Sequence, residues 1–321
     1  MVKPIVFVHI PKTAGTSFRW GADSFFGKEN VCRDYGKKSL ETSVIVRDWL
    51  SSEKDGWIFE REFIRQGYQF LTGHFNAAKY IDIFDAGRVI TFLRDPIQRI
   101  VSEYNHIVRN TGNEVSFESF YRNPEYINRQ LRLVGRRTWT EFGFIGFVDA
   151  YQESLSLLNR KFNIEIPYLH KNIAKSERVE PQLLSAEQLL ELRSLNAEEL
   201  DFYDRARIQF NWRIRLANAD QSFVCGCVTK FEAGRLKGWA VSEDVDEAVL
   251  VQLRVGKRVV AECKANEYRP YCKARGLGRG GFVGFSLEVC DVVGPDDVEC
   301  VVASTGQPLP FVDFDWTLPS I

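Results

Sequence analysis

Apolar residues follow two different patterns along the chain, and the pattern changes near residue 220. Before it, short continuous apolar runs alternate with stretches of helical periodicity. The runs at residues 5–8, 68–72 and 88–93 predict buried strands. Helices are predicted after the first and third runs, at residues 17–26 and 96–109. Strands alternating with helices predict an α/β fold, a P-loop-like doubly wound parallel sheet with flanking helices.

Residues 115–216 are expected to be mostly helical. Ser185 with Gln188 has the pattern of a capping box, and Asn196 with Glu199 gives a second helix-start signal. After residue 220 apolar positions alternate with period two, and a hairpin turn is predicted at Gly256. We therefore expect two domains, at residues 1–218 and 222–321, the second a small all-β sandwich.

Composition narrows the class of protein. The net charge is −1, so the surface as a whole would not attract nucleic acid or membrane. No apolar run approaches the roughly 20 residues that a transmembrane helix requires. The N-terminus lacks the long apolar core of a signal peptide, which predicts a cytoplasmic protein. A chain trimmed of a leader would show the same N-terminus.

Six of the seven cysteines lie after residue 220. Free thiols, disulfides and a zinc site are the competing interpretations. Cys225 and Cys227 are too close together for a C-x-x-C zinc knuckle, and no histidine lies beyond His170. We favour free thiols, because several of these cysteines lie in apolar strand-like runs.

Unusual polar residues follow the first three predicted strands, where an open parallel sheet binds its ligands. Gly15, Thr16 and Ser17 follow the first strand at a helix start, which favours an anion, and Lys12 adds a full charge. His74 follows the second strand and Arg94 the third. The nucleoside-triphosphate motif G-x-x-x-x-G-K-[ST] does not occur in the chain.

Several segments resemble motifs of the sulfotransferases that use 3′-phosphoadenosine 5′-phosphosulfate, in particular the uronosyl 2-O-sulfotransferases and their bacterial relatives. The resemblance covers about residues 1–215. The segment from His9 to Phe18 is similar to the 5′-phosphosulfate loop, and the segment from Arg94 to Tyr104 to the 3′-phosphate motif. Four further segments are also similar to that branch: the pair Gly73-His74, residues 128–132, residues 146–148 and residues 201–206.

The resemblance implies a role for each matching residue. The loop Lys12, Thr13, Ala14, Gly15, Thr16 and Ser17 would hold the 5′-phosphosulfate, and Arg94 and Ser102 would hold the 3′-phosphate. Lys12 would neutralise the leaving phosphate, and His74 would be the catalytic base. Adenine is expected near residues 170–176. The acceptor is expected to be a carbohydrate hydroxyl, an anionic glycan included, with Asn128, Gln130 and Arg132 as candidate contacts. No metal is expected, because the sulfuryl group carries little charge.

Other residues have competing interpretations. Five arginines between residues 122 and 137 could bind an anionic acceptor or form a solvated helix face. We expect His9 to be structural, and Glu103 and His106 to be surface or outer residues of the site. Where the family often has an acidic residue followed by arginine, this chain has Asp149 and Ala150.

The C-terminal segment resembles, more weakly, a β-sandwich that bacteria append to glycan-modifying enzymes, and there Trp239 could stack on a sugar or be buried. Two other functions stay open: a nucleotide-dependent phosphoryl transferase such as a kinase, and a catalytically silent glycan-binding protein.

Overall fold

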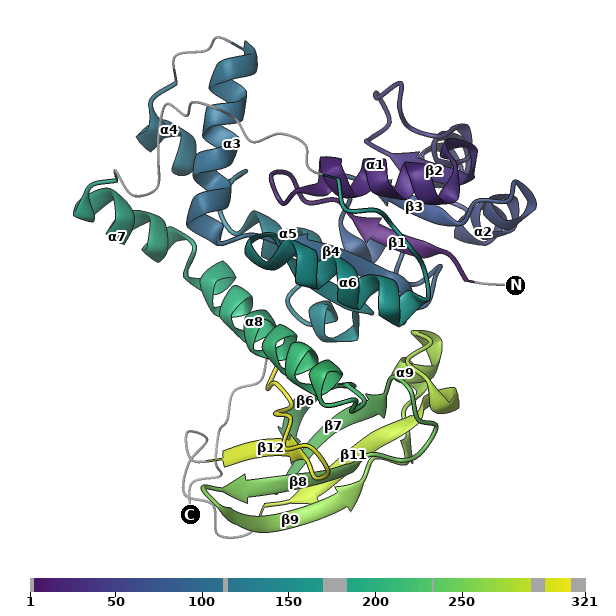
Figure 1. Cartoon of the computed structure of the whole chain (residues 1–321), viewed down its shortest axis with the longest axis vertical. Coiled ribbons are helices and arrows are strands. Elements are labelled where there is room, and N and C mark those ends of the chain that lie inside the picture. Colours follow the sequence, from purple (N-terminus) through teal and green to yellow (C-terminus); the bar gives the residue numbers. More distant parts are fainter. Residues whose placement is uncertain (1–2, 112–114, 170–183, 233, 290–297, 313–321) are drawn as a thin grey trace. The chain divides into compact units, whose positions relative to one another are not determined.

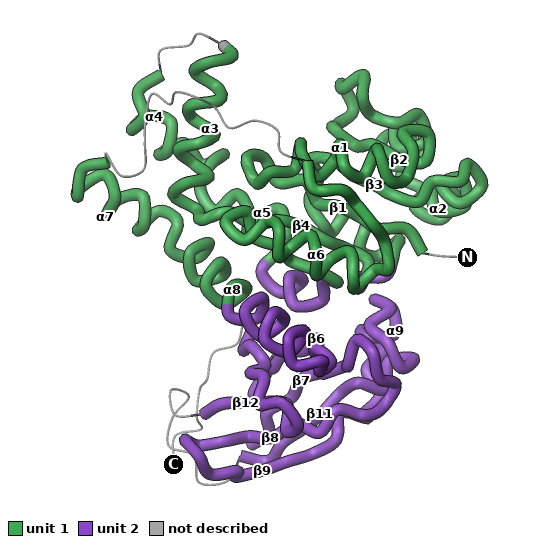
Figure 2. The backbone as a smooth tube through the Cα atoms, in the orientation of Figure 1, with its two compact units in different colours: residues 1–84, 88–135, 143–207 green, residues 85–87, 136–142, 208–321 purple. Residues whose placement is uncertain are grey.

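The computed structural model describes residues 3–111, 115–169, 184–232, 234–289 and 298–312 (Figure 1). They form two compact units. The first comprises Met1–Phe84, Arg88–Gly135 and Gly143–Arg207, and the second comprises Asp85–Gly87, Arg136–Phe142 and Ile208–Ile321 (Figure 2). The division falls inside one long helix, and the second unit takes in residues 136–142 from the N-terminal part of the chain. The predicted limits at residues 218 and 222 stay a prediction.

The first unit is built on a parallel sheet with the strand order β2-β3-β1-β4-β5. The strands are β1 (Ile5–Val8), β2 (Val31–Asp34), β3 (Phe70–Gly73), β4 (Val89–Leu93) and β5 (Phe144–Phe147). β1, β3 and β4 are buried at every position, as continuous apolar runs predict. β2 and β5 were not predicted. Together with the helices that follow the strands, the sheet confirms the α/β fold class.

Helices connect the strands. Their bounds are α1 (Gly15–Phe26), α2 (Gly56–Arg65), α3 (Pro96–Thr111), α4 (Phe117–Tyr121), α5 (Arg129–Val134), α6 (Tyr151–Phe162), α7 (Ala186–Leu195) and α8 (Ala197–Asn218). Pro96 begins α3, as predicted, and the capping box of Ser185 and Gln188 is present at the start of α7. Phe92 of β4 touches both Phe18 and Tyr151, so α1 and α6 cover the same face of the sheet.

The second unit contains antiparallel sheets with the orders β10-β11-β7-β6 and β12-β8-β9. Their elements are β6 (Val224–Glu232), β7 (Arg235–Ser242), β8 (Leu250–Val255), β9 (Arg258–Lys264), β10 (Glu267–Tyr268), α9 (Pro270–Ala274), β11 (Phe282–Glu288) and β12 (Val298–Val302). Alternate residues of both sheets, such as Val251 and Phe285, share one apolar core. The antiparallel sheets are those expected from the period-two pattern. Trp239 is buried, with 4% of its surface exposed, so the sugar-stacking interpretation is wrong.

The β8–β9 hairpin has the predicted two-residue turn. Val255 pairs with Arg258, so Gly256 and Lys257 form the turn, and Gly256 has a φ of 56°. Six cysteines in the described part of the chain are free thiols, and Cys290 lies outside it. Within the described ranges, no helix has both the length and the apolar content to cross a bilayer.

Candidate active site

The loop after β1 places the predicted donor residues in one turn. Lys12 and Ala14 both have left-handed backbone conformations, with φ of 69° and 60°. For residues other than glycine this costs about 1–2 kcal/mol each, and such strain gathers at functional sites. Ala14 is followed directly by the helical Gly15, and a left-handed residue beside a right-handed one turns successive N–H groups to one side. The turn therefore offers main-chain donors to an anion at the start of α1.

Inside the loop, Thr13 stabilises the turn. Its side chain is fully buried, and its hydroxyl donates to the Ile10 carbonyl at 2.9 Å. Only the main chain of Thr13 remains for a ligand. Thr16 is half-buried and Ser17 is 9% exposed, both in the first turn of α1.

Gly15 is required by its neighbour His9. A Cβ atom at position 15 would lie 2.0 Å from Cδ2 of the His9 ring, much closer than any real contact. His9 is itself buried, with 7% of its surface exposed, and its Nδ1 lies 3.2 Å from the hydroxyl of Tyr35. The ring of His9 therefore packs directly on the residue that begins α1. The expectation that His9 is structural agrees with this burial.

His74 follows β3 and projects beside the loop. Its Nδ1 lies 2.6 Å from the main-chain oxygen of His9. A carbonyl oxygen only accepts hydrogen bonds, so Nδ1 carries the proton in neutral His74. The lone pair is then on Nε2, as a general base requires. The side chain remains exposed, which leaves it open to a substrate.

The surroundings of His74 favour its neutral form. Partial burial of the ring is the largest cause that lowers its pKa, and the positive charges of Arg129 and Arg19 lower it further. The hydrogen bond to His9 and the charge of Glu103 act in the opposite direction. The net pKa is below the ordinary histidine value, so His74 is an unprotonated base at neutral pH.

Arg94 follows β4, and its main chain is held on both sides by one buried glutamine. Its N–H donates to Oε1 of Gln130 at 3.0 Å, and its carbonyl accepts from Nε2 at 2.8 Å. Ser102 lies farther along α3 and is half-buried. Arg94 and Ser102 thus belong to the end of one strand and the helix behind it, as predicted.

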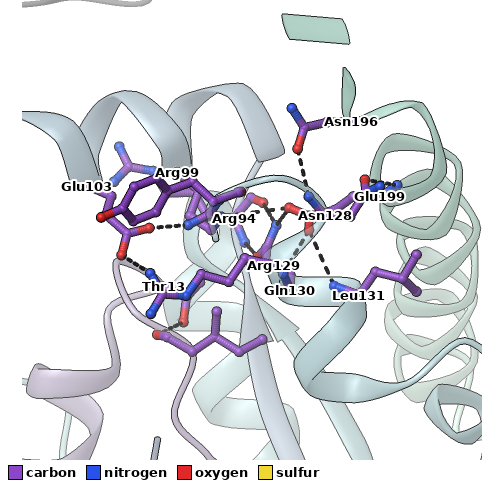
Figure 3. Close-up of polar contacts among 12 residues, drawn as sticks. Thr13, Arg94, Arg99, Glu103, Asn128, Arg129, Gln130, Leu131, Asn196 and Glu199 are labelled. Atoms are coloured by element: carbon purple, nitrogen blue, oxygen red, sulfur yellow. Dashed lines mark hydrogen bonds and ion pairs between the residues drawn. The ribbon is translucent and has the colours of Figure 1, made fainter. Parts of the chain in front are cut away.

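A network of buried charged side chains is connected to the Arg94 main chain through Gln130 (Figure 3). Glu199 has none of its surface exposed and accepts from the Gln130 main-chain N–H at 2.7 Å and from Gln130 Nε2 at 2.9 Å. Arg99 is also fully buried, with Nε 3.7 Å from Glu199 Oε1. Glu103 joins the network by pairing with both Arg99 and Arg129. These contacts fix the position of Gln130 and, through it, of Arg94.

This network decides two sequence interpretations. Glu103 is not a surface residue: it is 5% exposed and bridges two arginines. The helix start predicted at Asn196 and Glu199 is confirmed, because α8 begins at Ala197. The Glu199 carboxylate binds the Gln130 main chain, and the Asn196 side-chain oxygen accepts from the Asn128 N–H at 2.9 Å. The acidic residues were visible in the sequence, but two of their partners are distant: Arg129 lies 26 positions from Glu103, and Gln130 lies 69 positions from Glu199.

The three candidate acceptor residues differ in what they contact. Gln130 is fully buried and both of its amide hydrogens are used, so we assign it to holding Arg94. Asn128 accepts from the Glu199 N–H at 3.1 Å through its side-chain oxygen. Arg132 is exposed and donates to the Glu125 carbonyl. Acceptor contacts by Asn128 and Arg132 stay predictions.

Two of the five arginines between residues 122 and 137 have acidic partners in the first unit. Arg122 pairs with Glu191 at 2.6 Å, and Arg129 pairs with Glu103 in the network. Arg136 and Arg137 belong to the second compact unit. An arginine does lie beside Asp149: Arg207 of α8 pairs with its carboxylate and lies 3.8 Å over the Phe147 ring.

Two further expectations concern other ligands. In the part of the chain that the structure describes, no group of three or more His, Cys, Asp or Glu side chains could hold a metal ion. Residues 170–176, expected near adenine, lie outside the described residues.

Burial of His9 predicts a loss of stability in acid. Burial lowers its pKa from 6.5 to about 3, with the charges of His74 and Arg19 adding to the shift. Between these values the unfolded chain binds a proton that the folded chain does not. The contribution of neutral His9 to the free energy of unfolding is therefore complete above pH 6.5. As the pH falls below that value, this contribution is lost by about 1.4 kcal/mol per pH unit. From pH 6.5 to pH 5, wild type should lose about 2 kcal/mol more than His9→Phe in urea unfolding. Parallel losses in the two proteins would contradict the neutral, buried state of His9.

Comparison with known proteins identifies the family. The model of the sulfotransferase family matches residues 2–204. Among solved structures, a sulfotransferase from Alicyclobacillus acidocaldarius is similar at 15% sequence identity and a TM-score of 0.33, covering 63% of this chain and 96% of that chain. No curated protein matches the sequence. Because the family model covers well over half of the chain, the protein belongs to the sulfotransferase family.

Proposed function

We propose that the protein transfers the sulfuryl group of 3′-phosphoadenosine 5′-phosphosulfate to a hydroxyl of a carbohydrate acceptor. The observation that carries the proposal is the hydrogen bond from His74 Nδ1 to the His9 carbonyl. It leaves Nε2 as the basic nitrogen of a residue that contacts His9, whose ring packs on Gly15 in a turn with main-chain N–H groups that suit an anion. A base and an anion site on neighbouring strands β3 and β1 are the parts that transfer from an anionic donor to a hydroxyl needs.

The donor supplies an activated sulfuryl group and a phosphate leaving group. The main chain from Thr13 to Ser17 binds the 5′ end at the start of α1. Lys12 stabilises the negative charge that grows on the leaving phosphate. Burial is the largest cause that lowers the pKa of His106 on α3, and the charge of Lys12 lowers it further, so Lys12 lies close enough to α3 to act on it. His74 takes the proton of the acceptor hydroxyl through Nε2.

Arg94 and Ser102 bind the 3′-phosphate in this proposal. The two hydrogen bonds from Gln130 fix the Arg94 main chain, so less conformational freedom is lost when the side chain binds an anion. An arginine is suited to phosphate because its planar guanidinium donates two parallel hydrogen bonds.

The charges around His74 support an acidic group on the acceptor. Arg19 and Arg129 both act on its pKa, and they come from α1 and α5. Each has an acidic partner, Glu41 for Arg19 and Glu103 for Arg129, so the local charge is balanced in part. An acceptor with a carboxylate or sulfate near its hydroxyl would interact with these guanidinium groups. A cytoplasmic location remains part of the proposal.

Donor binding tests the proposal most directly. We expect adenosine 3′,5′-bisphosphate to raise the melting temperature more than ATP with magnesium does. Stabilisation by ATP and magnesium alone would indicate a phosphoryl transferase instead. Stabilisation by the bisphosphate without transfer to any glycan would indicate a catalytically silent relative.

Replacing Arg94 by alanine distinguishes binding of the donor's 3′-phosphate from binding of its 5′-phosphate. A charged hydrogen-bond pair contributes about 1.5–3 kcal/mol, so affinity for adenosine 3′,5′-bisphosphate should fall about 10- to 100-fold. Affinity for adenosine 5′-phosphate, measured by the same calorimetry, should change little. Arg109→Ala serves as the control, because Arg109 is exposed near the end of the same helix. Equal bisphosphate affinity in wild type and Arg94→Ala would remove Arg94 from the 3′-phosphate site.

A further inference from the structure

His9 connects three parts of the candidate site through its main chain. It is the residue directly after β1, and its N–H donates to the Gly73 carbonyl at 3.0 Å. Its own carbonyl accepts from His74 Nδ1 at 2.6 Å. Both polar groups of one peptide segment therefore engage the consecutive residues Gly73 and His74. These two hydrogen bonds fix the position of the His74 main chain at the end of β3 and the orientation of the His74 ring.

The side chain of His9 connects the same point to the donor loop. The ring occupies the space where a Cβ of Gly15 would be, 2.0 Å from Cδ2 and 2.2 Å from Nε2. The other side of the ring stacks near Phe7, with centroids 5.6 Å apart. The ring centroid of His74 lies 4.5 Å away. A shift of the start of α1 would thus move the His9 ring, and the ring is attached to the same residue whose main-chain carbonyl holds His74.

Tyr35, the residue after β2, holds the His9 ring in place. Its hydroxyl lies 3.2 Å from His9 Nδ1, and its ring meets the His74 ring edge-on with centroids 4.9 Å apart. Tyr35 is in turn fixed by the Thr42 hydroxyl, which accepts from the Tyr35 N–H at 3.0 Å. Three neighbouring strands, β2, β3 and β1, therefore contribute one residue each to a packed group of His9, Tyr35 and His74.

We propose that His9 is a positioning residue that couples the donor loop to the base. Its ring supports the start of α1, where the donor is proposed to bind, and its carbonyl holds His74 in the tautomer whose Nε2 is free to accept a proton. The inference rests on the proposed function of the loop and of His74. It adds that one residue, His9, positions both the donor loop and His74. Substituting His9 should therefore lower the turnover rate without removing the donor-binding site.

His9 does not compete with His74 for the proton of the acceptor. Burial, the largest cause, together with the charges of His74 and Arg19 lowers the pKa of His9 to about 3. The ring is neutral wherever His74 is active as a base. It therefore adds no positive charge next to His74 during the reaction.

Two substitutions test the coupling. His9→Phe keeps a flat ring against Gly15 but loses the contact with the Tyr35 hydroxyl, and Tyr35→Phe removes only that hydroxyl. Small displacements of a catalytic group cost up to about 100-fold in rate, so kcat should fall about 10- to 100-fold in His9→Phe and less in Tyr35→Phe. The Kd for adenosine 3′,5′-bisphosphate should change less than about 3-fold in either variant. Tyr68→Phe, a half-buried tyrosine before β3, is the matched control.

The tautomer of His74 gives a readout independent of turnover. Nitrogen-15 NMR of the ring, assigned by comparison with His74→Ala, should show Nδ1–H alone in wild type. A mixture with Nε2–H is expected in His9→Phe and Tyr35→Phe. Wild-type kcat together with a single Nδ1–H tautomer in both variants would overturn the inference. If the wild type failed to bind the bisphosphate, the proposed function would fail, and the tautomer measurement would still decide whether His9 positions His74.

Discussion

Replacing His74 by alanine is expected to lower kcat for sulfuryl transfer by about 10²–10⁴-fold, the usual contribution of a general base. The loss follows from the position of Nε2, which is the free nitrogen once Nδ1 donates to the His9 carbonyl. The variant should remain folded, because His74 is partly exposed and the space left by its side chain stays open to water. Transfer of labelled sulfate to a glycan acceptor measures kcat, and calorimetry with adenosine 3′,5′-bisphosphate checks that donor affinity is unchanged.

The pH dependence of turnover sharpens this prediction. Burial, Arg129 and Arg19 lower the pKa of His74, so the base loses its proton below the ordinary histidine value. The acid limb of kcat/KM should therefore lie below pH 6.5, and activity should be constant from there to neutral pH. His106→Ala, which removes an exposed histidine of α3, should keep the same profile. Full activity of His74→Ala at pH 7 would mean that another group is the base.

Replacing Glu199 by alanine is expected to destabilise the fold by about 3–5 kcal/mol, as for other buried ion pairs that lose one partner. The carboxylate is fully buried and accepts from the main-chain N–H groups of Gln130 at 2.7 Å and Leu131 at 3.3 Å. It also lies beside the buried guanidinium of Arg99. Its removal leaves these donors without their acceptor in a region that water does not reach.

Urea unfolding of wild type and variant measures this loss. Glu198→Ala is the matched control, because the neighbouring glutamate is exposed on the same turn of α8, and a change within about 0.5 kcal/mol is expected. Gln130 would also lose its anchor, so Glu199→Ala should weaken bisphosphate binding through Arg94. A loss below about 1 kcal/mol would show that the network does not stabilise the fold.

The positions of the candidate site residues could be predicted largely from the sequence because these residues follow buried strands. Strands β1, β3 and β4 are recognisable as continuous apolar runs, and the residues after them, among them Lys12, His74 and Arg94, are polar. Parallel strands present their carboxyl ends at one edge, so the pattern alone predicts that residues as far apart in sequence as Lys12 and Arg94 lie at the same edge. Strand β2 escaped prediction because two of its four residues are charged, and β5 escaped it because it lies within residues 115–216, which were expected to be mostly helical.

The tertiary structure decided how those residues are held. The sequence by itself determined the α/β class and the placement of Lys12, His74 and Arg94 directly after buried strands, because these depend on local pattern and on strand direction. The tautomer of His74, the clamp of Gln130 on Arg94, the burial of Glu103 and Glu199 and the pairing of Arg207 with Asp149 depend on contacts between distant segments. A glutamate within a predicted helix looks the same in the sequence whether its carboxylate faces water or pairs with a buried arginine. Only the packing of other elements around it sets its charge, its partners and its role.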